Sequence, residues 1–313
     1  MAIIKGIWKG IKGFFNVIFG INPKMSKTAP AIIGKVVKEI YMLFNIFVMF
    51  FPLFFMVLCA FKTNTEIIRE PFAWPSDINV LVTNVTNVWN GTISNVELTP
   101  FIVMLKNTVV LTFVPMVIMI LCATLCAYAI GRLTFSYKGI IMTFVMLVQT
   151  VPYFGYMYPL YFEVNFFNLL DTLAGTSLVL VAVSLPSTII LMIGFFKAFP
   201  VAVEEAAMID GANEFQKFMV IVMPMSISII GSMIIVNFMG YWNEFAIASL
   251  ILSSPEHRTI NVGMFALKSQ MGGVGKKDYI MTLLTLSAIP NLVFFSLFQK
   301  SIINGVSLGS VKE

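Results

Sequence analysis

Long stretches without a charged residue dominate the hydrophobic pattern of this 313-residue chain. A helix that crosses the hydrocarbon core of a bilayer needs about 20 mostly apolar residues, because ~30 Å is covered at ~1.5 Å per residue. Six apolar, charge-free windows reach that length: Tyr41–Phe61, Asn107–Gly131, Gly139–Phe162, Thr172–Phe196, Phe218–Asn243 and Tyr279–Gln299. The pattern therefore predicts an all-α integral membrane protein with six transmembrane helices.

A seventh charge-free window, Ile78–Val96, is rich in asparagine and threonine. Burying that many side-chain amides in lipid without partners would cost several kcal/mol. We expect this window to be an exposed loop and not a span.

The N-terminal segment, residues 1–39, has a different pattern. Apolar residues recur at helical spacing from Ile4 to Phe19, and Lys5, Lys9 and Lys12 fall between them. This pattern is typical of a basic amphipathic helix lying in the membrane interface, and a helix packed on the protein's own spans is the alternative. Residues 40–313 form the predicted membrane domain.

Lysine and arginine give the expected orientation. With six spans, both termini lie on one side of the membrane, and the segments on that side hold more lysines and arginines than the segments on the other. Because such residues are enriched in cytoplasmic loops, we expect both termini in the cytoplasm.

Composition excludes several classes of protein. Hydrophobic residues make up 58% of the chain and charged residues only 11%, whereas a soluble domain has about a quarter charged residues. The chain has one histidine, and Cys59, Cys122 and Cys126 all lie in apolar runs. We therefore expect no metal site, no disulfide framework and no soluble enzyme.

The stretch at about 197–224 is the most acidic part of the chain. Pro200 suits the first turn of a helix, and Glu204 and Glu205 follow near that helix's positive end. Gly211 suits a left-handed helix stop, and Asn213 can cap a second short helix. The sequence predicts a compact helix–turn–helix on the cytoplasmic face.

This loop has the features of a docking element. Ala206, Ala207 and Gly211 are small enough to allow another surface to approach closely, and Asp210 adds to the negative charge. An anionic membrane surface attracts lysine and arginine, so an acidic protrusion fits a basic protein partner better.

These residues also carry a family resemblance. The run Glu205-Ala206-Ala207, followed by Gly211, Ile221 and Pro224, resembles the EAA loop of bacterial ABC importer permeases. Further resemblances are Trp242-Asn243-Glu244-Phe245, Asn168-Leu169-Leu170-Asp171-Thr172, and Gly305-Val306 with Gly309. From about Tyr41 to Lys312 the chain is similar to the smaller permease subunit of maltose-type and multiple-sugar-type importers.

The resemblance implies a type I ABC importer permease fold and a defined set of partners. The chain would form half of the translocation pathway for a sugar or oligosaccharide, beside a second homologous permease. Two cytoplasmic ATPase subunits and an extracytoplasmic sugar-binding protein would complete the importer. ATP and Mg would bind to the partner subunits, with no cofactor on this chain. The residues implied in ATPase coupling are Glu204, Glu205, Ala206, Ala207, Asp210 and Gly211.

Two pairs of residues are candidates for the translocation pathway. Glu244 is the only ionisable residue predicted to lie inside a span, and a charged side chain there by default faces a cavity or a partner. Asn243 lies beside it. A structural pair at the permease–permease interface is an equal alternative. Tyr153 and Tyr156 lie near the outer end of the third window, where a role in the pathway competes with an interfacial aromatic belt.

A glycine-rich outer segment contains Gly272, Gly273 and Gly275. Its backbone can approach another surface closely, and the resemblance implies contact with the binding protein. The segment looks like a phosphate loop but lacks the GxxxxGK[ST] spacing.

Three other functions compete with a sugar permease. A permease for another solute, such as a peptide or a polyamine, would share the acidic loop. A membrane-embedded enzyme would need a catalytic motif such as HExxH or GxSxG, and the sequence has none. A secondary transporter would not need an acidic docking loop, and ATP dependence of uptake separates it from the leading hypothesis.

Overall fold

The computed structural model describes residues 29–93, 96–97, 99–198, 200–270 and 276–310. The chain divides into two compact units, Met1–Leu58 and Cys59–Glu313, called unit 1 and unit 2 below. The amphipathic helix predicted between Ile4 and Phe19 lies outside the described residues. The predicted boundary at residue 39 stays a prediction.

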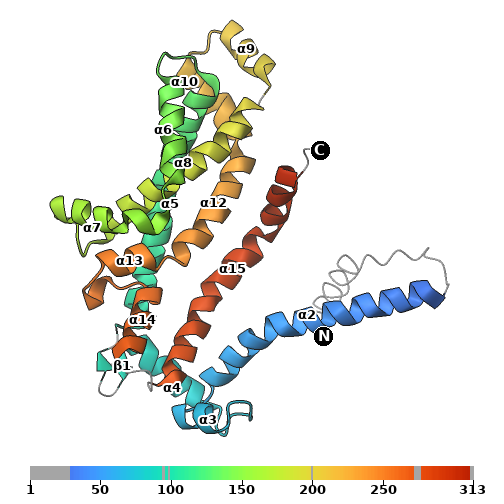
Figure 1. Cartoon of the computed structure of the whole chain (residues 1–313), viewed down its shortest axis with the longest axis vertical. Coiled ribbons are helices and arrows are strands. Elements are labelled where there is room, and N and C mark those ends of the chain that lie inside the picture. Colours follow the sequence, from blue (N-terminus) through green and yellow to red (C-terminus); the bar gives the residue numbers. More distant parts are fainter. Residues whose placement is uncertain (1–28, 94–95, 98, 199, 271–275, 311–313) are drawn as a thin grey trace. The chain divides into compact units, whose positions relative to one another are not determined.

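The described part of unit 1 is most of helix α2, which runs from Ala29 to Ala60 (Figure 1). Its large apolar side chains are exposed, with Phe44 and Phe47 each 63% accessible. A run of exposed aromatic and aliphatic side chains of this length suits contact with lipid or with another membrane helix.

Four helices in the described residues are long and apolar enough to cross a membrane: Lys35–Ala60 within α2, α5 (Phe101–Arg132), α8 (Leu173–Lys197) and Lys277–Phe298 within α15 (Lys277–Ser310). Two bent helix pairs pass the same test together, which gives up to six spans. The six predicted windows fall on these four helices and two bent pairs.

Each bent pair has a proline at its break. The first pair is α6 (Lys138–Thr150) with η1 (Tyr153–Tyr156) and α7 (Met157–Phe166), bent by 98°. Pro152 forces the preceding Val151 into an extended conformation, with ψ of 123°, which ends α6.

The second pair bends by 69° between Glu214–Met225 and Ile227–Trp242. It comprises α10 (Glu214–Lys217), η2 (Phe218–Val222), α11 (Met223–Met225) and α12 (Ile227–Trp242). Pro224 has no N–H to continue the helical ladder, and η2 is a π-helical turn, so the helix changes direction here.

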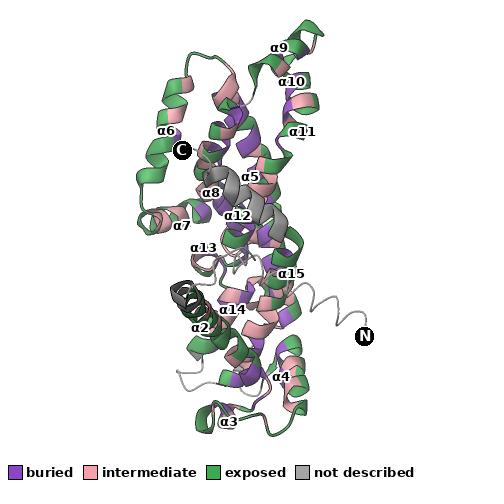
Figure 2. Cartoon of the chain, turned by 90° about the vertical axis from the view of Figure 1, so that its right-hand side faces the viewer, coloured by how far each residue is buried: buried purple, intermediate pink, exposed green. Residues whose placement is uncertain are grey.

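Helices α5 and α8 form the centre of unit 2. Gly131 permits their close approach, since a Cβ there would lie 3.2 Å from the Cβ of Phe196. Figure 2 shows buried residues concentrated along these two helices and α12. The buried rings of Phe238 in α12 and Phe294 in α15 stack on each other and continue this core, and the exposed Phe113 of α5 lies against Phe238.

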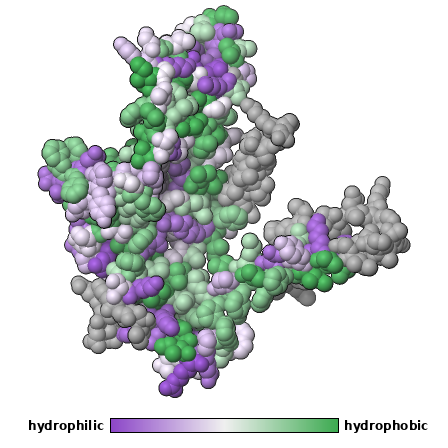
Figure 3. All heavy atoms as spheres, viewed as in Figure 1, coloured by the Kyte–Doolittle hydropathy of each residue, from purple (hydrophilic) through white to green (hydrophobic). Residues whose placement is uncertain are grey.

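One end of unit 2 carries α9 (Val201–Ile209), and the other carries α3 (Asn64–Arg69) and α4 (Asn79–Asn90). Figure 3 shows hydrophilic residues gathered around α9 and around α3. The remaining described elements are α13 (Ala246–Ile251), η3 (Pro255–His257) and α14 (Ile260–Gln270).

The prediction of an exposed loop at Ile78–Val96 is wrong. The segment forms α4 and a short antiparallel pair, β1 (Thr92–Ile93) with β2 (Val96–Glu97). Leu81, Val85 and Val88 recur at helical spacing and turn inward. Asn84, which argued against burial, is buried and donates to the carbonyls of Ala60 at 3.0 Å and Lys62 at 3.1 Å.

Candidate functional site: the α9–α10 loop and the α12–α13 break

The predicted helix–turn–helix is confirmed. Helix α9 begins after Pro200, whose φ of −62° and ψ of 118° place it at the N-cap. Gly211 has a φ of +82°, the left-handed conformation that favours glycine. The amides of Gly211 and Ala212 donate to the carbonyls of Met208 and Ala207, which closes the helix end.

The second short helix is also confirmed. The Asn213 side chain accepts from the amide of Gln216 at 2.8 Å, and the Gln216 side chain accepts from the amide of Asn213 at 2.9 Å. This reciprocal capping box fixes the start of α10. Lys217, which is buried, pairs with Glu214 at 2.7 Å.

The two adjacent acids of α9 have different environments. The Oε1 atom of Glu204 lies 2.8 Å from Nε of Arg132, the last residue of α5. The two side chains are only 11% and 10% exposed. Glu205, the next residue, is exposed. The two predicted coupling acids therefore differ in accessibility. The Glu204 carboxylate pairs with Arg132 inside this chain, and Glu205 faces outward.

The two alanines of α9, Ala206 and Ala207, also differ in accessibility. Ala207 is 5% exposed and packs inward, which differs from its predicted place on a docking face. Ala206 and Asp210 are exposed. Next to them, Ile209 is 87% exposed, so the outward face of the loop combines carboxylates with an apolar side chain.

An aromatic cluster supports the base of this loop. The Tyr128 ring lies 5.9 Å from that of Phe196 and 5.0 Å from that of Phe218, between ring centroids. These residues come from α5, α8 and η2, so the cluster joins both ends of the loop to the core. Sequence reasoning missed Arg132 as the partner of Glu204, because Lys197, on the last turn of α8, is a second cation at a helix end predicted to lie on the same side.

The four predicted pathway residues lie near two interruptions between helices. Tyr153 and Tyr156 belong to η1, at the α6–α7 bend, with ring centroids 5.8 Å apart. Asn243 and Glu244 follow the end of α12. Helix α7, which follows the first break, contacts α13, which follows the second, so these breaks lie near each other.

Glu244 lies outside the continuous helix α12, and its place inside the membrane stays a prediction. It comes two residues after Trp242 ends α12, and its Oε1 accepts from the amide of Ile247 at 2.7 Å. The carboxylate thus satisfies the first turn of α13, where the helix dipole favours a negative charge.

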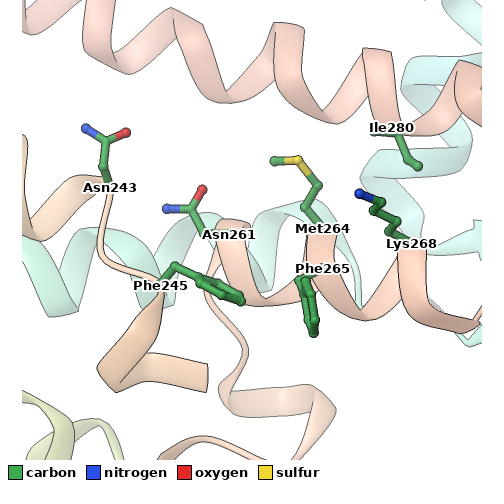
Figure 4. Close-up of a pocket in the computed structure, with 7 residues that line it drawn as sticks. All are labelled: Asn243, Phe245, Asn261, Met264, Phe265, Lys268 and Ile280. Carbon is green, nitrogen blue, oxygen red and sulfur yellow. The ribbon is translucent and has the colours of Figure 1, made fainter. Parts of the chain in front are cut away.

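A pocket of about 480 Å³ opens beside this break. Its lining residues, shown in Figure 4, are Asn243, Phe245, Asn261, Met264, Phe265, Lys268 and Ile280. Of the four predicted pathway residues, only Asn243 lines it. The volume is within the range of small-molecule sites in proteins.

A hydrogen-bond cluster ties the α7–α8 turn to the segment after α13. Asp171 accepts from the amides of Ser253 and Ser254 at 2.9 and 3.0 Å and from the Ser254 hydroxyl. Burial disfavours the charged carboxyl, but these hydrogen bonds outweigh it and lower the pKa of Asp171 to about 2. His257 Nδ1 lies 3.4 Å from the same carboxylate.

Gly272, Gly273 and Gly275 lie outside the described residues. The segment that follows them begins α15 beside α3, because the amide of Lys277 donates to Oδ1 of Asn64 at 2.9 Å. Within the described ranges, no group of three or more His, Cys, Asp and Glu side chains could hold a metal ion.

Comparisons with known proteins agree with this geometry. The profile of the family described as "binding-protein-dependent transport system inner membrane component" matches residues 119–307. The diacetylchitobiose uptake system permease protein NgcG of Streptomyces coelicolor is 28% identical over 263 residues, covering 83% of each chain. The galactooligosaccharides transport system permease protein GanQ of Bacillus subtilis is 28% identical over 193 residues, covering 62% of this chain and 68% of that protein.

A solved structure shares the fold. A chain in the crystal structure of a bacterial ABC transporter involved in the import of the acidic polysaccharide alginate aligns with a TM-score of 0.73 and 17% identity. The alignment covers 88% of this chain and 99% of that chain.

The long apolar helices and the structural match give the chain the fold of a type I ABC importer permease. The chain belongs to the family of inner membrane components of binding-protein-dependent transport systems. It is a permease and not an enzyme, and importers of this kind work with ATPase and substrate-binding partners.

Proposed function

We propose that this permease moves a sugar or oligosaccharide. The relatives named above include permeases for diacetylchitobiose and for galactooligosaccharides, which supports a sugar over a peptide or a polyamine. In this proposal the chain pairs with a second homologous permease, and each of the two provides half of the pathway. Two ATPase subunits hold ATP and Mg, and an extracytoplasmic binding protein delivers the sugar.

The observation that carries the coupling part of the proposal is the opposite placement of Glu204 and Glu205. Arg132 neutralises Glu204 inside the chain, so the outward charge of α9 comes from Glu205, with Asp210 at the helix end. An exposed carboxylate beside the exposed Ile209 side chain fits a cleft with a basic group and an apolar wall.

The rigid base of the loop supports its use as a coupling element. The Arg132–Glu204 ion pair joins α9 to the end of α5, and the Tyr128 cluster joins the loop to α8. A displacement of α9 by a moving ATPase is therefore passed to the two central helices, because packed elements move as units and do not deform continuously.

The proposed orientation places α9 and both termini in the cytoplasm. The end of unit 2 opposite α9 carries α3, α4 and the start of α15, where Gly272, Gly273 and Gly275 would meet the binding protein. The proposed pathway residues, Asn243, Glu244, Tyr153 and Tyr156, lie at helix breaks in the described part of unit 2. Such breaks free backbone and side-chain groups for a polar solute.

Transport assays in proteoliposomes test this function. The permease, its partner permease and the ATPases are reconstituted with ATP inside and the cognate binding protein outside. Uptake of a panel of labelled oligosaccharides, with a dipeptide and spermidine as comparisons, is then measured. We expect ATP-dependent uptake of at least one oligosaccharide and none of the comparisons. Uptake of only the dipeptide or spermidine would refute the sugar assignment.

A further inference from the structure

One face of α14 lines most of the pocket beside the α12–α13 break. Asn261, Met264, Phe265 and Lys268 follow each other at intervals that place them on one side of a helix. Seven residues of helix cover ~10 Å, so this face presents an amide at one end and an ammonium at the other. The pocket is thus elongated and chemically different at its two ends.

The end of the pocket that holds Asn243 and Asn261 presents hydrogen-bond acceptors. The Nδ2 group of Asn243 donates to the carbonyl of Met239 at 2.8 Å. That of Asn261 donates to the carbonyls of Trp242 and Glu244, both at 3.4 Å. With both amino groups held by the backbone, the two amide oxygens are left to accept from a ligand, and Figure 4 shows them on the side that faces Met264. Two acceptors side by side suit the hydroxyl groups of a sugar.

The middle of the pocket is aromatic and apolar. The rings of Phe245 and Phe265 lie 5.1 Å apart at 58°, and Phe265 is 56% exposed. The Met264 thioether also lines the pocket, and in Figure 4 it points away from the two rings. Flat apolar surfaces of this kind pack against the C–H face of a sugar ring, while polar groups at the rim fix its orientation.

Lys268 supplies the positive end. Its side chain is exposed, and none of the ion pairs among the described residues includes it. The acids nearest to the lining residues in sequence, Glu244 and Asp278, are not part of the lining. An ammonium without a carboxylate partner favours an anionic group on the ligand.

We propose that this pocket is a subsite for a sugar that bears an anionic substituent, with Lys268 selecting that substituent. Asn243 and Asn261 accept hydroxyl groups, and Phe245 with Phe265 contacts the ring. This inference rests on the proposed function, because it names the class of sugar for the same permease.

A matched pair of probes tests the inference. Digalacturonate and its carboxyl-reduced form, the digalactose of the same linkage, differ only in charge and in the group that Lys268 would meet. Binding of each is measured by calorimetry on the complete complex in zwitterionic nanodiscs, without the binding protein. We expect the wild type to bind digalacturonate about tenfold more tightly, the ratio given by ~1.4 kcal/mol from a charge-assisted hydrogen bond.

Variants assign that preference to the pocket. Lys268→Met is expected to abolish the tenfold preference and to leave the affinity for digalactose within about twofold. Asn243→Ala should weaken both probes equally, because it removes an acceptor that both would use. Lys106→Met removes an exposed lysine of α5 as a control and should retain the full preference. Equal binding of the two probes by the wild type, or an unchanged preference in Lys268→Met, would overturn the inference.

Repeating the titration in nanodiscs with phosphatidylglycerol separates a sugar from a lipid headgroup. The pocket would belong to lipid if phosphatidylglycerol nanodiscs abolished digalacturonate binding by the wild type and if Lys268→Met retained less phosphatidylglycerol than the wild type. That result would overturn the inference. The sugar-uptake assay is read separately. ATP-dependent uptake of oligosaccharides, with digalacturonate and digalactose bound equally by the wild type and by Lys268→Met, leaves the proposed function intact and removes only the subsite.

Discussion

The carboxylate of Glu204, in the first turn of α9, lies 2.8 Å from the guanidinium of Arg132 at the last residue of α5. This pair brings together two helices that are separated in the chain by α6, α7 and α8. It turns one acid of an adjacent pair into the protein, and Glu205 then points away because neighbouring residues are ~100° apart around a helix. The orientation of α9 and the identity of its outward charge thus have one structural origin.

Removing the cation of this pair should destabilise the permease. Arg132→Gln leaves the Glu204 carboxylate buried without its partner, which costs about 3 kcal/mol in comparable buried pairs. The apolar double substitution Arg132→Met with Glu204→Leu should recover most of that loss. The free energy of unfolding, measured by chemical denaturation in detergent, checks both expectations.

Lys197→Gln provides the matched control, because it removes an exposed cation from the last turn of the neighbouring α8. We expect it to change stability by less than about 0.5 kcal/mol. An Arg132→Gln cost as small as that of the control would mean that the ion pair contributes nothing to the placement of α9.

The turn after α9 should resist a side chain. Gly211 has a φ of +82°, and Gly211→Ala is expected to cost about 1 kcal/mol although a Cβ there would meet no atom within 4 Å. Gly194 in α8 has equal space for a Cβ. Because it lies inside an α-helix, Gly194→Ala should stabilise the protein by ~0.5–1 kcal/mol. Denaturation curves that change in the same direction for both variants would refute the backbone explanation.

The Asp171 cluster predicts a specific acid sensitivity. The lowered folded-state pKa, about 2 against the ordinary value of 3.8, means that the carboxylate stabilises the fold fully above about pH 4. As the pH falls from about 4 to 2, this contribution of about 2 kcal/mol is lost. The unfolding free energies of wild type and Asp171→Asn should therefore converge over this range.

Glu163→Gln changes an exposed carboxylate at the end of α7 and serves as the control for that titration. We expect its stability difference from the wild type to stay small, because the side chain is exposed. A wild type and an Asp171→Asn variant that differ by the same amount at pH 2 and pH 6 would show that the cluster does not titrate as described.

The sequence supported the architecture of the loop but not the direction of its side chains. Gly211 and Asn213 have local roles, a left-handed stop and a cap, that depend on residue type alone, and both were predictable. Which of Glu204 and Glu205 turns inward depends on the rotational phase of α9. Apolar residues surround both acids in sequence, so no hydrophobic stripe sets that phase, and a contact with Arg132, 72 residues away, decides it.

The helix breaks limited sequence reasoning in a similar way. Glu244 directly follows an apolar window and was predicted inside a span, but the chain leaves the helix at Asn243, and the carboxylate accepts from an amide of the next helix. Asn84 reads as too polar to bury, but two backbone carbonyls more than 20 residues away satisfy it. In both cases the polar group finds a partner that only the folded backbone provides.

The coupling role of Glu205 is best tested by ATP-dependent uptake in the reconstituted importer carrying Glu205→Lys, measured together with the amount of ATPase that copurifies. We expect this charge reversal to weaken ATPase association by a few kcal/mol and to abolish uptake, and we expect the opposite reversal of a basic residue in the ATPase cleft to rescue it. Asp210→Lys, a reversal at the helix end, should have a smaller effect on both. Normal uptake by Glu205→Lys with the ATPases still bound would contradict the claim that Glu205 couples this permease to ATP hydrolysis.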